Sequence, residues 1–215
     1  MTRSSWVIKL GGSSLQQPQL RQILHNISKH ACLIVPGGGV FADQVRSEQA
    51  KHGLSDVAAH WMSILAMQQT GMLMADLCPA IPMAESLIMA QAQVSSGRPC
   101  IWLPAISEMR KAAGIHMNWQ YTSDSIALWV CQQLTIPSRL LLVKSCSLKR
   151  LPRTVSVKTI QQQGMIDEGF SSLLTKGGCQ VWIASLLEHQ DWIPVLASPE
   201  TQKNIHTLRE SLPLS

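Results

Sequence analysis

The sequence is poor in aromatic and charged residues and has no long hydrophobic run. Aromatic residues make up 5% of the 215 residues and charged residues 14%, whereas 46% are hydrophobic. No run approaches the ~18 apolar residues that indicate a membrane-spanning helix. The apolar stretch Trp6–Leu10 is too short for a signal peptide and contains Lys9. We therefore expect a globular protein of the cytoplasm that does not bind membranes.

Metal-binding patterns are also missing. The six cysteines include no Cys-x-x-Cys pair, and none of the seven histidines forms a ligand pair with a cysteine. A zinc site is therefore not expected, and no residue is assigned as a metal ligand. Because most of the cysteines lie in apolar segments, we expect reduced thiols in the core. The cysteines are Cys32, Cys78, Cys100, Cys131, Cys146 and Cys179.

Positive charge is in modest excess, with a formal net charge of +5. The basic residues gather in residues 144–158. A nucleic-acid surface would favour aromatic residues interleaved among them, but this segment contains none. A solvated loop or an edge that handles ATP explains the cluster at least as well. We therefore expect no nucleic-acid partner.

An apolar strand that runs directly into glycines opens the chain. Residues 6–10 carry a single cation, Lys9, and are followed by Gly11, Gly12 and Ser13. Such a strand brings one cation and bare backbone N–H groups to a single point, and glycine allows close approach of a ligand. Phosphate is the anion that such turns most often bind. The alternative is a tight turn without a ligand.

A second apolar strand runs into three more glycines. Residues 31–36 lead into Gly37, Gly38 and Gly39, and residues 16–30 between the two strands have apolar residues at helical spacing. A βαβ unit places both glycine loops at the same edge of a parallel sheet, where ligands bind in open α/β folds. Neither loop has the spacing of a Walker P-loop or of a dinucleotide-binding turn, because the lysine precedes the glycines.

A third motif begins a helix. Thr122 or Ser123 is a suitable N-cap, and Asp124 follows in the first turn. Taken alone, Asp124 reads as an ordinary acid that favours the helix dipole. The strand at residues 139–143 then ends at Lys144, which is either a surface lysine or, like Lys9, a cation delivered to the edge of the sheet.

The rest of the pattern predicts alternating helices and strands. Residues 55–77 predict a helix with too few polar residues to face solvent, so it is either central to the fold or buried at a subunit contact. The other predicted elements are helices over 82–94, 122–134 and 204–210, a helix start over 164–174, and strands over 100–103, 139–143 and 181–184.

Taken together, the Lys-x-Gly-Gly-Ser strand end, the Gly-Gly-Gly loop and the Thr-Ser-Asp helix start resemble the amino acid kinase family. Members of that family phosphorylate carboxylates, carbamate or existing phosphates with ATP. The resemblance implies a three-layer αβα sandwich with a mainly parallel central sheet, similar to carbamate kinase. It further implies one domain over residues 1–215, with the acceptor bound by about residues 1–135 and the nucleotide by about residues 136–215.

The resemblance also implies roles for particular residues. Lys9, Asp124 and Lys144 would be catalytic, with Asp124 holding the lysines in place. The remaining site residues would be Gly11, Gly12 and Ser13 for phosphate and Gly37, Gly38, Gly39, Thr122 and Ser123 for the acceptor. ATP and Mg²⁺ would be required, the acceptor would be a small phosphate or carboxylate, and the helix over 55–77 would pair with its twin in a homodimer or larger homo-oligomer.

Residues 119–125 and 166–170 resemble one branch of the family, which converts 5-(aminomethyl)-3-furanmethanol phosphate to a diphosphate in methanofuran-type cofactor biosynthesis. The chain departs from the pattern in two places. Ser145-Cys146-Ser147 stands where many members have Val-Asp-Gly, and Ala184-Ser185 stands where the branch tends to have Asn-Gly. Two alternatives stay open: a family kinase that forms an acyl phosphate, and a non-catalytic relative that binds nucleotides or anions.

Overall fold

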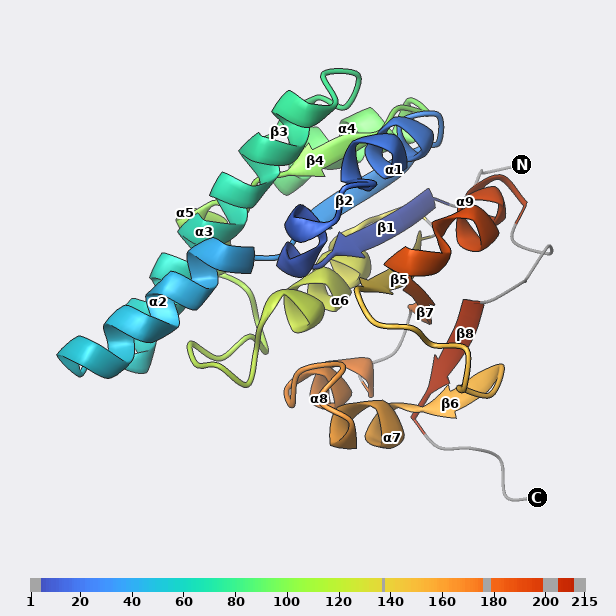
Figure 1. Cartoon of the computed structure of the whole chain (residues 1–215). Helices are drawn as coiled ribbons and strands as arrows, with labels where there is room; N and C mark the ends of the chain where they lie inside the picture. The colour runs from blue at the N-terminus through green and yellow to red at the C-terminus, as the bar shows by residue number, and fades with distance from the viewer. Residues whose placement is uncertain (1–4, 137, 176–178, 199–204, 211–215) are drawn as a thin grey trace.

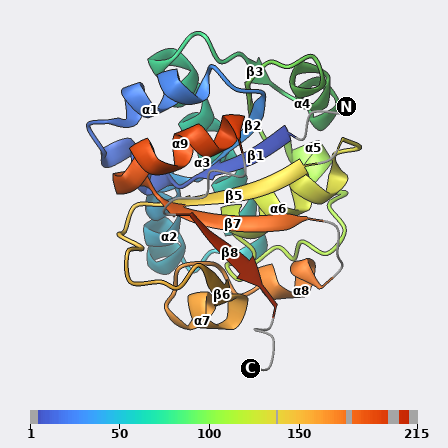
Figure 2. The same cartoon turned by 90° about the vertical axis from the view of Figure 1, so that its right-hand side faces the viewer.

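An eight-stranded sheet runs through the computed structural model, which describes residues 5–136, 138–175, 179–198 and 205–210. The strands are β1 (Ser5–Leu10), β2 (Cys32–Pro36), β3 (Met83–Ala84), β4 (Cys100–Trp102), β5 (Ser138–Lys144), β6 (Thr154–Ser156), β7 (Gln180–Ser185) and β8 (Ile205–Arg209). Their order is β3-β4-β2-β1-β5-β7-β8-β6. All neighbouring pairs are parallel except β7 and β8, as Figure 2 shows for the central strands.

Helices cover both faces of this sheet. They are α1 (Leu20–Ile27), α2 (Gly39–His52), α3 (Asp56–Leu77), α4 (Leu87–Ser95), α5 (Ile106–Met109), α6 (Ser123–Gln133), α7 (Val157–Gln162), α8 (Phe170–Leu174) and α9 (His189–Ala197), with 3-10 turns at Gly12–Gln16 and Leu186–Glu188. One hydrophobic cluster joins the sheet to α1, α9 and the end of α3, and the other joins it to α4, α6 and α8. The predicted αβα sandwich is therefore confirmed (Figure 1).

The alternation of side chains along the strands decides which residues face α6. Trp6, Ile8 and Leu10 of β1 point into the cluster of α1 and α9, so Val7 and Lys9 point to the opposite face. Leu140 and Leu142 of β5 join the α6 cluster in the same way. Because side chains alternate along a strand, Lys144 lies on the same face of β5 as these two leucines. Both lysines therefore lie at the carboxyl edge of the sheet, on the face that α6 covers.

Most predicted elements are present, with three differences. The helix predicted over 16–30 begins only at Leu20, after a 3-10 turn and Pro18. In the segment predicted as a helix over 82–94, β3 comes first, and α4 begins after Ser86, whose side chain accepts a hydrogen bond from the Met89 N–H. The helix predicted over 204–210 is wrong over its described residues. They form β8, because the backbone of this segment pairs with both β7 and β6.

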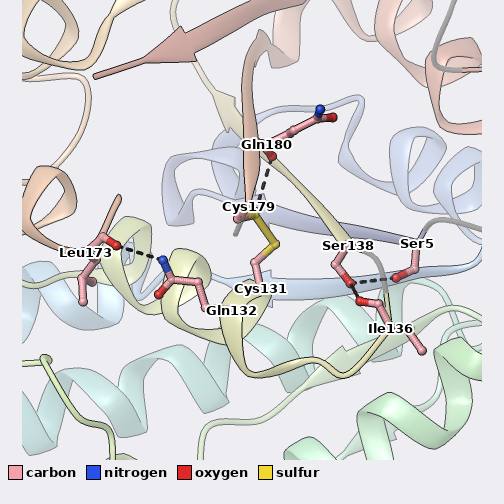
Figure 3. Close-up of a disulfide and its surroundings, with 8 residues drawn as sticks. All are labelled: Ser5, Cys131, Gln132, Ile136, Ser138, Leu173, Cys179 and Gln180. Carbon is pink, nitrogen blue, oxygen red and sulfur yellow. Dashed lines mark hydrogen bonds between the residues drawn. A yellow bond between two sulfur atoms is a disulfide. The ribbon is translucent and has the colours of Figure 1, made fainter. Parts of the chain in front are cut away.

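The prediction of six reduced core thiols is only partly correct. Cys32, Cys78 and Cys100 are buried and free, but Cys146 is exposed. Cys131 and Cys179 form a disulfide, with Cα atoms 6.6 Å apart (Figure 3). The fold brings the last turns of α6 against the start of β7, although 48 residues separate the two cysteines. In the part of the chain that the structure describes, no helix is long and apolar enough to cross a membrane.

Candidate functional site

One buried carboxylate lies between two buried lysines at the carboxyl edge of the sheet. Lys144 Nζ lies 2.8 Å from both carboxylate oxygens of Asp124, and Lys9 Nζ lies 3.1 Å from Oδ1. The side chains of the three residues are 8–11% exposed. They come from β5, α6 and β1, so the parallel sheet and the first turn of one helix assemble the group. The structure thus brings the three residues that were predicted to be catalytic into direct contact.

The charges of this group affect one another strongly. Burial by itself raises the pKa of Asp124, but the adjacent Lys144 and Lys9 outweigh burial and bring it below its ordinary value. Burial lowers the pKa of Lys144 below its ordinary value, although the Asp124 carboxylate partly opposes that change. Two cations against one anion leave the group with a surplus positive charge, which favours an anionic ligand.

The two glycine loops are in backbone contact with each other. A Cβ on Gly12 would lie 1.9 Å from the Gly39 Cα, and one on Gly37 would lie 2.6 Å from the Gly12 nitrogen. The Gly37 N–H also donates to the Leu10 carbonyl at 2.8 Å, and Gly39 has a φ of +54°. Glycine is therefore required at Gly12, Gly37 and Gly39 by the approach of one loop to the other.

A cavity of about 390 Å³ opens beside these loops. Six of the predicted residues line it: Gly12, Ser13, Gly38, Gly39, Thr122 and Ser123. Gly11 and Gly37 do not line it. Gly11 instead faces the lysine group, since a Cβ there would lie 3.4 Å from Lys9 Nζ.

Further side chains complete the cavity wall, and of those named here the sequence pattern singled out only Trp119, within residues 119–125. Arg46 of α2 lies over the ring of Trp119 at 3.6 Å from its centroid, and both line the cavity. His60 of α3 lines it as well, and burial lowers the pKa of its imidazole. Asn118 is a further lining residue. The wall thus offers one guanidinium, an aromatic ring and several polar groups to a small anionic molecule.

A second carboxylate, the half-buried Asp167, caps the helix that carries Asp124. Its Oδ2 accepts hydrogen bonds from the Thr122 N–H at 2.9 Å, the Thr122 hydroxyl at 2.8 Å and the Ser125 N–H at 3.0 Å. Its Oδ1 accepts from the Ser125 hydroxyl. Thr122 occupies the predicted N-cap position, but its side chain does not cap the helix; it donates to Asp167 instead.

The segment after β5 joins this edge through polar contacts. The Ser13 hydroxyl donates to the Ser145 hydroxyl at 2.9 Å, and the Ser147 hydroxyl donates to Glu188 at 3.2 Å. Ser145-Cys146-Ser147, where the family pattern has Val-Asp-Gly, thus lies beside the first glycine loop. Among the described residues, no group of three His, Cys, Asp or Glu side chains is placed to hold a metal ion.

Fold and site together define an α/β protein with a cationic centre beside a cavity lined by two glycine loops. The chain belongs to the amino acid kinase family, whose model matches residues 4–185.

Individual relatives agree with this family. The chain is 27% identical, over 134 residues, to [5-(aminomethyl)furan-3-yl]methyl phosphate kinase of Methanocaldococcus jannaschii; the match covers 60% of this chain and 61% of that protein. Among solved structures, UMP kinase from Bacillus anthracis has a TM-score of 0.71 at 13% identity, covering 100% of this chain and 99% of the other. Uridylate kinase from Archaeoglobus fulgidus has a TM-score of 0.69 at 13% identity, covering 97% and 100%. At these identities the two structures show the fold alone.

Proposed function

We propose that the protein transfers the γ-phosphoryl group of ATP to a small phosphomonoester, forming a diphosphate, as a step of methanofuran-type cofactor biosynthesis. The observation that carries this proposal is the buried Lys9–Asp124–Lys144 group beside a cavity that also presents Arg46. The name of the Methanocaldococcus jannaschii relative, a kinase of a furan-based phosphomonoester, supports the substrate class.

Catalysis in this proposal consists of positioning and charge neutralisation. Lys9 and Lys144 stabilise the negative charge on the phosphoryl group as it passes between oxygens, while Asp124 keeps both ammonium groups at the transfer point. Backbone N–H groups of Gly11 and Gly12 and the Ser13 hydroxyl contact the transferred phosphoryl group. Mg²⁺ would come with ATP, would need few direct protein ligands, as is usual for this ion, and would supply further positive charge at the phosphates.

The acceptor occupies the 390 Å³ cavity. Gly38, Gly39, Thr122 and Ser123, which line the cavity, hold its phosphate close to the transfer point. Gly37 does not line the cavity and contributes by holding this loop against Gly12. The Arg46 guanidinium, stacked on Trp119, supplies the positive charge that a phosphomonoester needs and a neutral acceptor does not. We further assign the acceptor to about residues 1–135 and ATP to about residues 136–215 of a single domain.

The activity is tested by incubating the purified chain with ATP, Mg²⁺ and [5-(aminomethyl)furan-3-yl]methyl phosphate, with ³¹P NMR to detect a diphosphate. We expect Lys9→Ala to lower kcat by about 10³-fold or more, because it removes a cation from the transition state. Its fold is checked by circular dichroism. Normal turnover by folded Lys9→Ala would contradict the assignment.

Two further measurements separate the alternatives. Hydroxylamine traps an acyl phosphate but not a diphosphate, so a trapped product would show that the acceptor is a carboxylate. Calorimetry of ATP binding addresses the departure at Ser145-Cys146-Ser147. A chain that does not bind ATP would be a non-catalytic relative.

A further inference from the structure

The first turn of α6 depends on a residue far away in the sequence. A helix begins with N–H groups that have no partner within the helix, and a side chain at the N-cap usually accepts one of them. Here the Thr122 side chain makes no such bond. The Ser125 N–H instead donates a hydrogen bond to Asp167, which lies between α7 and α8. The cap of α6 is therefore supplied from another part of the fold.

The two residues that donate hydrogen bonds to Asp167 lie on either side of Asp124 in the sequence. Thr122 precedes Asp124 by two residues and Ser125 follows it directly, and each gives Asp167 both its backbone N–H and its hydroxyl. The backbone of this single turn determines where the Asp124 carboxylate lies. That carboxylate in turn contacts Lys144 at 2.8 Å and Lys9 at 3.1 Å.

Asp167 is itself held firmly. The Gln161 side chain donates to the carbonyl oxygens of Asp167 and Glu168 at 2.9 and 3.0 Å. The Gly169 N–H donates to the Gln120 carbonyl at 2.7 Å. The Tyr121 ring packs so closely on Gly169 that a Cβ there would lie 2.5 Å from Cδ1. The segment with Asp167 is thus fastened to the residues just before α6.

The arrangement has an electrostatic cost. Burial raises the pKa of Asp167, and the nearby negative charge of Asp124 raises it further, while the hydrogen bonds from Ser125 and Thr122 oppose this rise. Placing a second carboxylate near Asp124 therefore works against ionisation of Asp167. Its four hydrogen bonds to the start of α6 offset part of that cost.

We propose that Asp167 is a positioning residue for phosphoryl transfer: by capping α6 it fixes the Asp124 carboxylate between Lys9 and Lys144. The effect on the rate of phosphoryl transfer rests on the proposed function. The role of Asp167 in placing the Asp124 carboxylate does not rest on it. Asp167 itself is not assigned any contact with ATP or the acceptor.

Kinetics of Asp167 variants form the first test. We expect Asp167→Ala to lower kcat by about 10- to 100-fold, since small displacements of catalytic groups cost rates of that order. Asp167→Asn keeps an oxygen for the two backbone N–H groups and should lose only about 3- to 10-fold in kcat. Glu168→Gln, a neighbouring exposed acid, is the matched control and should leave kcat unchanged. Val195→Ala, a substitution at a buried residue of α9 away from the site, controls for a general loss of stability.

The pKa of Asp124, measured by ¹³C NMR of its carboxyl carbon, gives a second test that needs no turnover. Asp124→Asn identifies the signal. Removing the charge of Asp167 alone lowers the Asp124 pKa, whereas moving Asp124 away from the lysines raises it. We expect a rise in Asp167→Ala and no rise in Asp167→Asn. A lower folded fraction would reduce apparent kcat but would leave this pKa in the folded molecules unchanged.

The outcomes are distinct. The proposal is overturned if folded Asp167→Ala has the wild-type kcat, or if Asp167→Asn has it where the alanine variant does not fold. It is also overturned if the pKa of Asp124 does not rise in Asp167→Ala. If the wild-type chain transfers no phosphoryl group to any phosphomonoester, the proposed function has failed. The NMR measurement then decides the role of Asp167 by itself.

Discussion

At the scale of single residues, the central feature is one carboxylate shared by two buried ammonium groups. Removing three ionised groups from water is costly, and the mutual attraction of Lys9, Asp124 and Lys144 offsets that cost only while all three are in place. A site that holds a surplus positive charge away from water attracts a phosphate strongly. The same burial lowers the pKa of Lys144 and so makes this lysine easier to deprotonate.

The lowered pKa of Lys144 predicts a pH dependence. Its ordinary value is 10.5, and burial lowers it more than Asp124 restores it. Because the protonated form carries the charge that transfer needs, kcat should fall as pH rises through a pKa below 10.5. Lys144→Arg stays protonated, so its activity should continue to higher pH. The measurement is kcat against pH for both proteins, and an identical alkaline limb in the two would contradict this role.

Part of this site follows from the sequence. Strand ends with lysines and an acid at a helix start can be recognised locally, and the parallel sheet then brings Lys9, Lys144 and Asp124 together. Arg46 could not be found in this way, because it lies on a helix whose side chains are mostly exposed and show no apolar period. Asp167 was noticed only within a family resemblance, since its capping role depends on contacts across 42 to 45 residues.

At the scale of elements, α6 is attached at both ends by the segment that includes α8. Asp167 caps its first turn, while near its last turn the Gln132 side chain donates to the Leu173 carbonyl at 2.9 Å and Cys131 bonds to Cys179 (Figure 3). The helix that carries Asp124 is therefore held at both ends.

Loss of the disulfide should weaken this attachment measurably. It closes a loop of about 48 residues, for which removal typically costs ~2–4 kcal/mol. We expect Cys131→Ser with Cys179→Ser to lower the free energy of unfolding in urea by that amount. Cys146→Ser, which removes an exposed free thiol, is the control. Equal urea midpoints for the double variant and the wild type would show that the bond does not contribute.

The helix α1 was predictable from its hydrophobic period, and α3 was predictable from its long and nearly unbroken apolar sequence. The failure at β8 has a physical reason: a short polar segment becomes a strand only because β7 and β6 offer backbone partners on both sides. Its sequence contains no local signal for that pairing. The same holds for the disulfide, because the pairing of cysteines depends on tertiary contact.

At the scale of the whole molecule, α3 leaves apolar surface uncovered. It extends with α2 beyond the sheet (Figure 1), and Val57, Leu65 and Met72 on it are 42–50% exposed. A stripe of this kind on a long apolar helix is typical of a subunit interface. We therefore propose that two copies of the chain associate through α3.

Sedimentation tests this association. We expect the wild type to sediment as at least a dimer of the 23.7 kDa chain. Leu65→Glu with Met72→Glu should shift it to monomer, because a buried unpaired carboxylate is costly. Ile88→Glu, on the exposed face of α4, should leave the assembly intact. A wild-type monomer at micromolar concentration would refute the interface.

The backbone contact between the two glycine loops limits how this protein can change its substrate. Because no side chain fits between Gly12 and Gly39, the part of the cavity nearest the transfer point cannot be reshaped without separating β1 from β2. Residues at the far wall, such as Arg46 and Trp119, have no such restriction. Selection for a new acceptor would therefore act on α2, α3 and the segment before α6, while the chemistry at the loops stays the same.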